Sequence, residues 1–583
     1  MKKKRILSLL ILSIVFQFAN ASEDSVKFDD LKPELIKYIE KTMKSAKING
    51  LSIAVVDNQE VIWAEGFGYA DEENDVKATA KTVYNVGSMS KLFTATCVMQ
   101  LAEQGKVDID ESIKNYIPEF YIKSHYEKPG IITPRLLLTH HSGIPGDVLK
   151  DLFSENPEPF TNIVSLLNQE YNCTQPNFGW AYSNAGFSLL GVLVERASGE
   201  NFIDYTQNQL LEKLNMRNSS FKHTPEVEKL FSKGYVRGKE YNEPLARDVP
   251  AGMLNSNVLD LANFIKMTFN NGQFGVNQII SANTLNEMQT PQNEDCPLFE
   301  YERRMGLGWM LSKNWEFAGG MAHHGGDTYV FHSDLITLPG QKLGVVVLTN
   351  SSGGSRNTSK IAMEILTRTL EVRRNLKKSV NEKVEKLKYV KPNADILKKS
   401  EGDYIFGGGQ PMTIKVDGNK LIGSNPEFKM VFKYNNKGRF TPGIRLLGFI
   451  PITMKSQQMK MKTVNGMDVI LMYDENNDSS IVGIRTQKPE ITDVWKNRFG
   501  KYKAVNSNSD FKTLSDFELS EMDGYLIFQV RTFNGHLLKL AIKPLNDNMA
   551  IIDGIGRGAG ATLIFEEDKI RYSGYELMKE SDI

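Results

Sequence analysis

The segment 88–104, SMSKLFTATCVMQLAEQ, constrains the fold of this chain more than any other. Its apolar residues recur at helical spacing on more than one face, so it predicts a helix that is apolar around much of its circumference. Such a helix is buried, and burying it requires other elements on several sides. The chain is long enough for this, since 583 residues correspond to roughly three or four domains.

The segments around this helix predict a mixed α+β domain over residues 28–370. Residues 51–56 form an apolar strand, and residues 61–66 form its hairpin partner after the turn at Asp57–Asn58. Amphipathic patterns predict helices at 185–198 and 258–270, another strand at 343–349 and a closing helix at 360–370.

Residues 371–400 separate this domain from a different kind of sequence. They contain ten Lys or Arg residues against four Asp or Glu residues, which is typical of a basic, solvated linker or helix. Beyond residue 400 helical periodicity gives way to short strands. The predicted strands are a 412–422 hairpin turning at Asp417–Gly418, then 431–440, 469–473, 526–530, 537–542 and 561–565.

A Gly-x-Tyr triplet occurs at residues 402–404 and again at 500–502, each time at the start of a strand-rich stretch. We therefore predict two all-β units, 401–490 and 491–583. One larger barrel in two halves is the alternative.

The N-terminus has the pattern of an export signal. Lys2 to Arg5 are basic, residues 6–18 are apolar, and Ala19-Asn20-Ala21 is a small-x-small cleavage site. This thirteen-residue, mostly apolar run is too short to span a bilayer comfortably, so an uncleaved membrane anchor is the weaker interpretation. Residues 1–21 are thus expected to be removed after Ala21. The mature chain is then secreted or periplasmic, without a transmembrane anchor.

Charge and cysteine content exclude two classes of protein. Lys plus Arg and Asp plus Glu both number 70, so no basic excess points to nucleic acid as a partner. The three cysteines cannot form a disulfide framework. Cys97 lies in the apolar helix and is expected to be a buried thiol.

Ser88-x-x-Lys91 is the first candidate catalytic motif. Residues i and i+3 share a helix face, so the Lys91 amine can reach the Ser88 hydroxyl and make it a nucleophile. Ser219 and Ser509 match the same pattern, but neither begins a long apolar helix. The plainer alternative is a serine cap followed by a surface lysine.

Tyr182-Ser-Asn184 is the second motif, directly before the predicted helix at 185–198. A phenol near ammonium groups loses its proton more easily and can act as a base, and Asn184 offers a donor and an acceptor to a substrate amide. A turn with a helix cap is the alternative. Tyr434-x-Asn436 matches too, in the β-rich region.

His324-Gly325-Gly326 is the third motif, and its glycines let a substrate backbone approach the strand edge. His141-Ser-Gly143 also matches. His323, His324 and His332 could instead bind a metal, but no further ligand recurs at zinc-like spacing, so neither metal nor cofactor is predicted. The Gly-x-Ser-x-Gly motif of lipases is absent from the sequence.

The ordered motifs S-x-x-K, Y-x-N and H-x-G resemble those of the class C β-lactamase and D-Ala-D-Ala carboxypeptidase superfamily (peptidase family S12), which also contains D-aminopeptidases and esterases. The segments between them are similar as well: residues 136–145 resemble the family's LLTHTSG loop, and residues 250–254 with 260–262 resemble its PAGGL…DLA segment. The resemblance covers residues 28–370. It implies an antiparallel sheet flanked by helices, a helical lobe, and a site between them.

The resemblance also implies a role for each motif residue. Ser88 would be acylated, Lys91 and Tyr182 would share its proton, and Asn184 would bind the substrate amide. The N–H groups of Ser88 and Asp327 would form the oxyanion hole, beside Gly325 and Gly326. His324 stands where β-lactamases usually carry the lysine of K-T-G, so strong β-lactam hydrolysis is not expected.

The sequence therefore predicts a secreted serine hydrolase acting through an acyl-enzyme on peptides containing D-amino acids or on esters, with a small-molecule or peptide substrate. A β-lactamase is the alternative within the enzyme class. A catalytically silent ligand- or cell-wall-binding protein, with its function in the β-units, is the alternative outside it.

Overall fold

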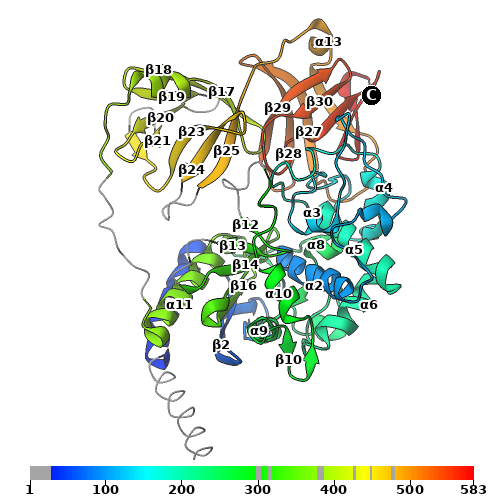
Figure 1. Ribbon diagram of the computed structural model, residues 1–583, viewed down its shortest axis with the longest axis vertical. Helices are drawn as coiled ribbons and strands as arrows, with labels where there is room; N and C mark the ends of the chain where they lie inside the picture. The colour runs from blue at the N-terminus through cyan, green and yellow to red at the C-terminus, as the bar shows by residue number, and fades with distance from the viewer. Residues whose placement is uncertain are drawn as a thin grey trace, which may run out of the picture.

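The computed structural model describes residues 28–296, 304–312, 315, 318–376, 387–424, 429–446, 450–473 and 479–582. The predicted export signal and part of the basic linker lie outside these residues. The described chain forms three parts: an α+β domain, a nine-stranded sheet and a closed barrel (Figure 1). No helix within the described ranges is both long and apolar enough to cross a membrane.

The α+β domain is built on one antiparallel sheet of eight strands. Their order is β12 (Arg304–Met305), β13 (Met310–Ser312), β14 (Met321–Asp327), β15 (His332–Leu338), β16 (Leu343–Thr349), β1 (Gly50–Asp57), β2 (Glu60–Asp71) and β3 (Val76–Lys77). The predicted strands at 51–56, 61–66 and 343–349 are confirmed as β1, β2 and β16.

Helices cover both faces of this sheet, which explains the uninterrupted apolar run of β16. Val345 and Val347 pack into a cluster with α11 (Asn357–Arg374) and the helix over residues 28–46. Val346 and Leu348 point to the opposite face and join the larger cluster that contains α2 (Ser90–Glu103) and α9 (Val258–Phe269). Successive residues of a strand face opposite sides, so both sides of β16 must be apolar.

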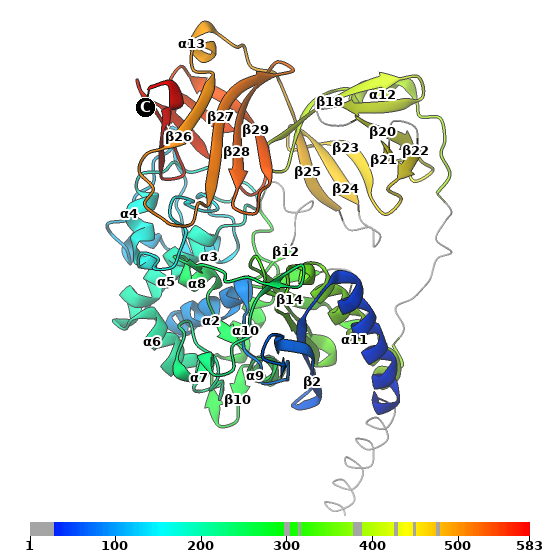
Figure 2. The same cartoon turned by 180° about the vertical axis from the view of Figure 1, so that it is seen from behind.

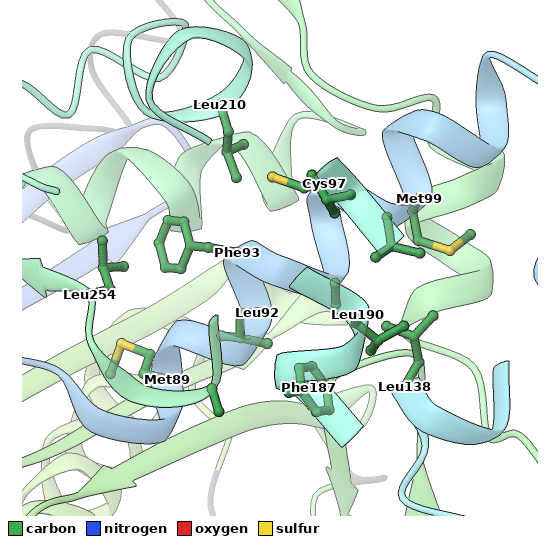
Figure 3. Packing of buried hydrophobic residues seen from close by; sticks show 14 of the residues in the cluster. Met89, Leu92, Phe93, Cys97, Met99, Leu138, Phe187, Leu190, Leu210 and Leu254 are labelled. Atoms are coloured by element: carbon green, nitrogen blue, oxygen red, sulfur yellow. The ribbon is translucent and has the colours of Figure 1, made fainter. Parts of the chain in front are cut away.

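The remaining helices form a lobe at one side of the sheet. They are α2 (Ser90–Glu103), α3 (Pro134–Leu138), α4 (Ile163–Leu167), α5 (Asn184–Ser198), α6 (Phe202–Thr206), α7 (Pro225–Glu228), α8 (Val249–Gly252) and α10 (Ala282–Met288). Every residue of α2 from Ser90 to Leu101 is buried. Figure 3 shows the cause: side chains from α5 and from the segments around Leu138, Leu210 and Leu254 surround the helix. The predicted central, buried helix is confirmed.

The C-terminal region forms two separate β-units and not one barrel in two halves. The first is a sheet in the order β20 (Lys429–Tyr434), β19 (Lys420–Ser424), β18 (Gln410–Asp417), β17 (Gly402–Phe406), β25 (Ser479–Thr486), β24 (Met467–Tyr473), β23 (Gln458–Val464), β21 (Phe440–Leu446) and β22 (Ile450–Thr453), with β20 also paired to β21. The second is a closed barrel of β26 (Gly500–Ala504), β27 (Leu514–Met522), β28 (Tyr525–Thr532), β29 (Leu537–Asn546), β30 (Met549–Ile552), β31 (Thr562–Phe565), β32 (Lys569–Tyr572) and β33 (Tyr575–Lys579).

The Gly-x-Tyr echo marks equivalent positions in the two units. Each triplet follows a short helix, α12 (Ala394–Ser400) or α13 (Asp493–Lys496), and opens the first strand of its unit. In both, the tyrosine hydroxyl donates to the carbonyl four residues upstream: Tyr404 to Ser400 at 3.2 Å and Tyr502 to Arg498 at 2.6 Å. The triplet therefore joins the entering helix to the first strand in the same way twice.

Two sequence predictions of secondary structure were inaccurate. Residues 431–440 are not one strand, because a turn after Tyr434, held by the Asn435 side chain, separates β20 from β21. The closing helix α11 begins before residue 360 and continues past 370 to Arg374, where Arg373 and Arg374 both pair with Asp57. Cys97 is a buried thiol, as predicted.

The barrel rests on the helical lobe through the segment 147–153 (Figures 1 and 2). The Leu149 N–H donates to Ser573 Oγ at 2.9 Å, the Ser507 hydroxyl donates to Asp151 at 2.6 Å, and the Ser509 hydroxyl donates to the Phe153 carbonyl at 2.8 Å. These contacts bring the end of the chain beside residues that follow the 136–145 loop.

Candidate active site

Ser88 lies in the short 3₁₀ turn η1 (Gly87–Met89) that leads directly into α2. Its neighbours Gly87 and Met89 are buried, whereas Ser88 is only partly buried and lines a cavity of about 580 Å³. The turn is fixed from both sides, because the Ser90 hydroxyl donates to the Gly87 carbonyl at 2.6 Å and accepts the Leu254 N–H at 3.0 Å. Ser88 is therefore a rigidly held hydroxyl open to the cavity.

Lys91 lies one turn further along α2 and is fully buried. Its Nζ lies 3.2 Å from Ser88 Oγ, 2.8 Å from Asn184 Oδ1 and 2.6 Å from the Ala251 carbonyl oxygen. A neutral amine has two N–H groups and one lone pair. The amide and carbonyl oxygens accept the two N–H groups, so the lone pair faces the Ser88 hydroxyl.

The surroundings of Lys91 favour this neutral form. Burial lowers the pKa of Lys91 well below its ordinary value, and the Arg557 cation lowers it further, while Asp147 and Asp248 act in the opposite direction. A depressed pKa shifts the amine toward its neutral form, which carries a free electron pair. Lys91 is therefore suited to accept the Ser88 proton.

Tyr182 and Asn184 stand where α5 begins. Ser183 caps the helix by accepting the Gly186 N–H at 2.8 Å, and this turn directs the side chains of Tyr182 and Asn184 toward Lys91. The Tyr182 ring lies 4.9 Å from Lys91 Nζ and 4.2 Å from the ring of the buried His140. The structure thus brings the S-x-x-K and Y-x-N motifs into contact, although they are about ninety residues apart in the sequence.

The ionisation predicted for Tyr182 is wrong in direction. Burial raises the pKa of Tyr182 above its ordinary value, and this exceeds the lowering by a hydrogen bond with Ser88 and by Arg557. The sequence argument assumed ammonium groups near the phenol, but the pKa of the neighbouring Lys91 amine is itself lowered by burial, which disfavours its charged form. The raised pKa favours the protonated phenol, which can donate a hydrogen bond.

The third motif lies across the cavity on β14. Backbone atoms of η1 and β14 come so close that a Cβ added at Gly326 would lie 1.9 Å from the Val86 oxygen and 2.9 Å from Ser88 N. A Cβ added at Gly87 would lie 2.9 Å from Asp327 N. The backbone nitrogens of Ser88 and Asp327 therefore lie close together where only glycine fits, which agrees with the expected oxyanion hole.

His324 is buried on β14, with its ring centre 6.4 Å from that of Tyr182 and its Nδ1 2.6 Å from the Gly325 oxygen. It therefore borders the site. His332 lies instead against Asp327, at 2.5 Å. Among the described residues, no group of three or more His, Cys, Asp or Glu side chains is placed to hold a metal ion.

The other S-x-x-K and Y-x-N matches lie away from this arrangement. Ser219 is buried and donates to Asp260 at 2.8 Å, while Lys222 is exposed. The Ser509 hydroxyl is engaged by the Phe153 carbonyl, and Tyr434 lies at the end of β20 in the nine-stranded sheet. Of the three S-x-x-K matches, the structure combines that at Ser88 with a Y-x-N and an H-x-G motif.

Two functional residues were missed from the sequence. Asp147 accepts a hydrogen bond from Asn184 Nδ2 at 2.8 Å, and Arg557 of the barrel donates to Asp147 at 2.6 Å. Arg557 also lines the cavity. Asp147 lies just after the 136–145 loop, and this position was the only sequence feature that could have indicated it. Arg557 lies in a stretch to which the sequence analysis assigned no function.

The barrel also supplies an apolar wall to the cavity. Leu514, Val530, Phe533, Leu538 and Leu540 of the barrel line it together with Leu149, Leu152 and Phe153 of the α+β domain. Phe153 packs on Phe533 with ring centres 5.5 Å apart. One end of the cavity therefore presents the nucleophile and polar groups, and the other accepts an apolar group.

A sheet flanked by helices, a helical lobe and a Ser–Lys–Tyr group between them define a β-lactamase or penicillin-binding-protein-like protein. The sequence profile of the Beta-lactamase family matches residues 35–367, more than half of the chain. The chain belongs to the β-lactamase family.

Curated relatives agree with this assignment. Protein flp of Staphylococcus aureus (strain N315) is 26% identical over 332 residues, which are 55% of this chain and 64% of the relative. The putative penicillin-binding protein PbpX of Bacillus subtilis (strain 168) is 28% identical over 251 residues, 42% of this chain and 60% of the relative. The chain thus spans less than two thirds of the length of each.

Solved structures extend the likeness beyond the family domain. The octameric penicillin-binding protein homologue from Pyrococcus abyssi is 25% identical, with a TM-score of 0.52 over 78% of this chain and 99% of that one. SurE with D-Leu, 17% identical, has a TM-score of 0.55 over 79% of this chain and all of its own, which shows a shared fold alone.

Proposed function

We propose that the protein is an exported serine hydrolase that forms an acyl-enzyme on Ser88 and acts on peptides containing D-amino acids or on esters. One observation carries the proposal: both N–H groups of Lys91 have acceptors, so its lone pair faces the Ser88 hydroxyl at 3.2 Å. Export rests on the N-terminal sequence pattern of residues 1–21 alone.

Acylation then begins with attack on the substrate carbonyl. Ser88 Oγ attacks the substrate carbonyl carbon while its proton passes to Lys91 Nζ. The carbonyl oxygen gains the negative charge and accepts hydrogen bonds from the N–H groups of Ser88 and Asp327. Loss of one such donor typically costs ~10²–10³ in kcat.

Tyr182 connects the captured proton with the leaving group. Its phenol shares a hydrogen bond with Ser88 and lies against the Lys91 amine, so it can pass a proton from Lys91 to the departing nitrogen or oxygen while taking one itself. The oxyanion then collapses: the carbonyl double bond reforms, the bond to the leaving group breaks, and the acyl group stays on Ser88 Oγ. Water then attacks the ester, and the same groups return the proton to Ser88.

The surroundings of Ser88 favour peptides and esters over β-lactams. His324 occupies the position at which a lysine is expected in β-lactamases, and its ring is buried beside Tyr182. The apolar wall accommodates an uncharged acyl group or side chain. D-configuration rests on the family resemblance and is the finer part of the proposal.

Covalent labelling tests the proposal directly. The full chain, a Ser88→Ala variant and a Lys91→Met variant are treated with a fluorophosphonate probe and measured by intact-mass spectrometry. We expect one adduct on the wild type, none on Ser88→Ala, and labelling slowed ~10²–10⁴-fold by Lys91→Met, which removes the base and keeps the length of the side chain. No adduct on the wild type, or an adduct that survives Ser88→Ala, contradicts the proposal.

A substrate panel then separates the substrate classes. Turnover of D-alanyl peptides or short acyl esters, with slow or no hydrolysis of nitrocefin, is the expected result. Rapid nitrocefin hydrolysis would instead identify a β-lactamase. Labelling of Ser88 without turnover of any panel member would favour a binding protein.

A further inference from the structure

Arg557 of the barrel lines the same cavity as Ser88. Arg557 lies in the loop between β30 and β31, where four glycines, Gly554, Gly556, Gly558 and Gly560, have positive φ angles. The loop lies directly against the α+β domain, since a Cβ added at Gly560 would be 2.2 Å from the Cys173 oxygen. Glycine is required there by close backbone contact.

A continuous hydrogen-bonded chain runs from this loop to the serine. Arg557 Nη2 and Nε donate to Asp147 Oδ2 at 2.6 and 3.0 Å. The other oxygen, Oδ1, accepts from Asn184 Nδ2 at 2.8 Å. Asn184 Oδ1 accepts from Lys91 Nζ at 2.8 Å, and Nζ lies 3.2 Å from Ser88 Oγ.

This series of hydrogen bonds determines which way the Asn184 amide points. An ionised carboxylate only accepts hydrogen bonds, so Asp147 holds the NH₂ end of the amide and leaves the oxygen for Lys91. With the amide reversed, its N–H groups would face those of the Lys91 amine. Lys91 would then lose one of its two acceptors, and its lone pair would no longer be directed at Ser88.

Arg557 is what keeps Asp147 ionised. Burial by itself would raise the pKa of the Asp147 carboxyl, but Arg557 and the Asn184 amide bring it below its ordinary value. Arg557 also offsets the negative charge of Asp147, which would otherwise favour protonation of Lys91. The other ionisable groups that face Lys91 are Asp248, which pairs with Arg247, and Tyr182, His140 and His324.

We propose that Arg557 is a positioning residue of the active site: through Asp147 it orients the Asn184 amide and so directs the Lys91 amine at Ser88. The C-terminal barrel is then a working part of the serine site and not an appendage. The inference rests on the proposed acylation of Ser88, and the experiment below distinguishes failure of the one from failure of the other.

The test compares full-length variants by the second-order rate of fluorophosphonate labelling between about pH 5 and pH 10. Arg557→Gln is expected to slow labelling about tenfold or more. It should also move the acid limb, the fall of the labelling rate at low pH where Lys91 becomes protonated, to higher pH, because the Asp147 charge is no longer offset and raises the pKa of Lys91. Arg557→Lys restores the cation and should recover most of the rate. Arg571→Gln is the matched control, since Arg571 lies on the same barrel near Gln169 but outside the chain to Ser88.

Asp147→Asn provides a second, opposite readout. It leaves the Arg557 cation unbalanced beside Lys91, so the acid limb should move to lower pH although labelling is also slower. A merely structural role would slow both variants without moving their limbs in opposite directions. If Arg557→Gln does not fold, as judged by circular dichroism, the pH position of the acid limb in Asp147→Asn tests the proposal by itself.

Two results would overturn the inference. One is an Arg557→Gln protein that is labelled at the wild-type rate, or that loses no more than Arg571→Gln. The other is an acid limb that stays in place or rises in Asp147→Asn. A wild-type protein that is not labelled on Ser88 refutes the proposed function itself and is thus a separate result.

Discussion

Gly326→Ala tests whether the close approach of β14 to η1 forms the oxyanion hole. The added Cβ would lie 1.9 Å from the Val86 oxygen, 2.6 Å from Ser333 Oγ and 2.9 Å from Ser88 N. Real contacts of a Cβ stay beyond 3.0 Å, so the backbone before Ser88 must move by about 1 Å. A shift of this size withdraws the Ser88 N–H from the developing oxyanion and predicts a ~10²–10³-fold loss of acylation rate.

The neighbouring Gly325→Ala is the comparison. Its Cβ would meet nothing closer than the Ser333 oxygen at 3.4 Å, an ordinary contact on the same strand. We expect its loss of rate to be at least about tenfold smaller. The assay is the fluorophosphonate labelling rate at Ser88, with urea denaturation of each variant as the control for folding. Equal losses in the two variants, with equal stability, would refute the oxyanion-hole geometry.

Three further predictions concern single side chains. Tyr182→Phe keeps the ring but removes the hydroxyl that carries the proton, so labelling and ester turnover should fall ~10²-fold or more; an unchanged burst with 4-nitrophenyl acetate would exclude that role. Burial raises the pKa of Asp334 from 3.8 to about 6. The free energy of unfolding therefore falls as the pH rises between these two values, and above them it is lower by about 3 kcal/mol. Asp334→Asn, which still accepts from Ser359, should therefore raise the urea midpoint at pH 8 but not at pH 4, and an equal gain at both would contradict this. Burial also raises the pKa of Cys97 and Cys173 to about 12, so neither should react with a disulfide reagent at pH 8 before unfolding; peptide mapping that finds either one modified in the folded protein would contradict that expectation.

The sequence by itself was sufficient for features that depend on local geometry. Ser88 and Lys91 are one helical turn apart, so their proximity follows from the i, i+3 spacing once a helix is recognised. The uninterrupted apolar character of α2 likewise required a central position, because no face of it could remain in water. The hairpin at Asp417–Gly418 follows from its turn residues.

The surroundings of individual side chains, in contrast, could not be predicted from the sequence. Tyr182 was expected to lose its proton more easily near ammonium groups, but the pKa of each group depends on its burial and on all its neighbours, and these lower the pKa of Lys91 and raise that of Tyr182. The strand predicted at 431–440 failed for a similar reason, since the side-chain hydrogen bonds of Asn435 hold a turn that periodicity does not reveal.

The sequence alone thus determined the family motifs and the place of Ser88 at the start of a buried helix. Only the tertiary structure decided that the last domain lines the cavity beside Ser88. Arg557 and Asp147 are 410 residues apart, and nothing local in either segment specifies the partner. Their pairing depends on the docking of a closed barrel on residues 147–153, and such long-range packing is set by the complementarity of whole surfaces and not by any short pattern.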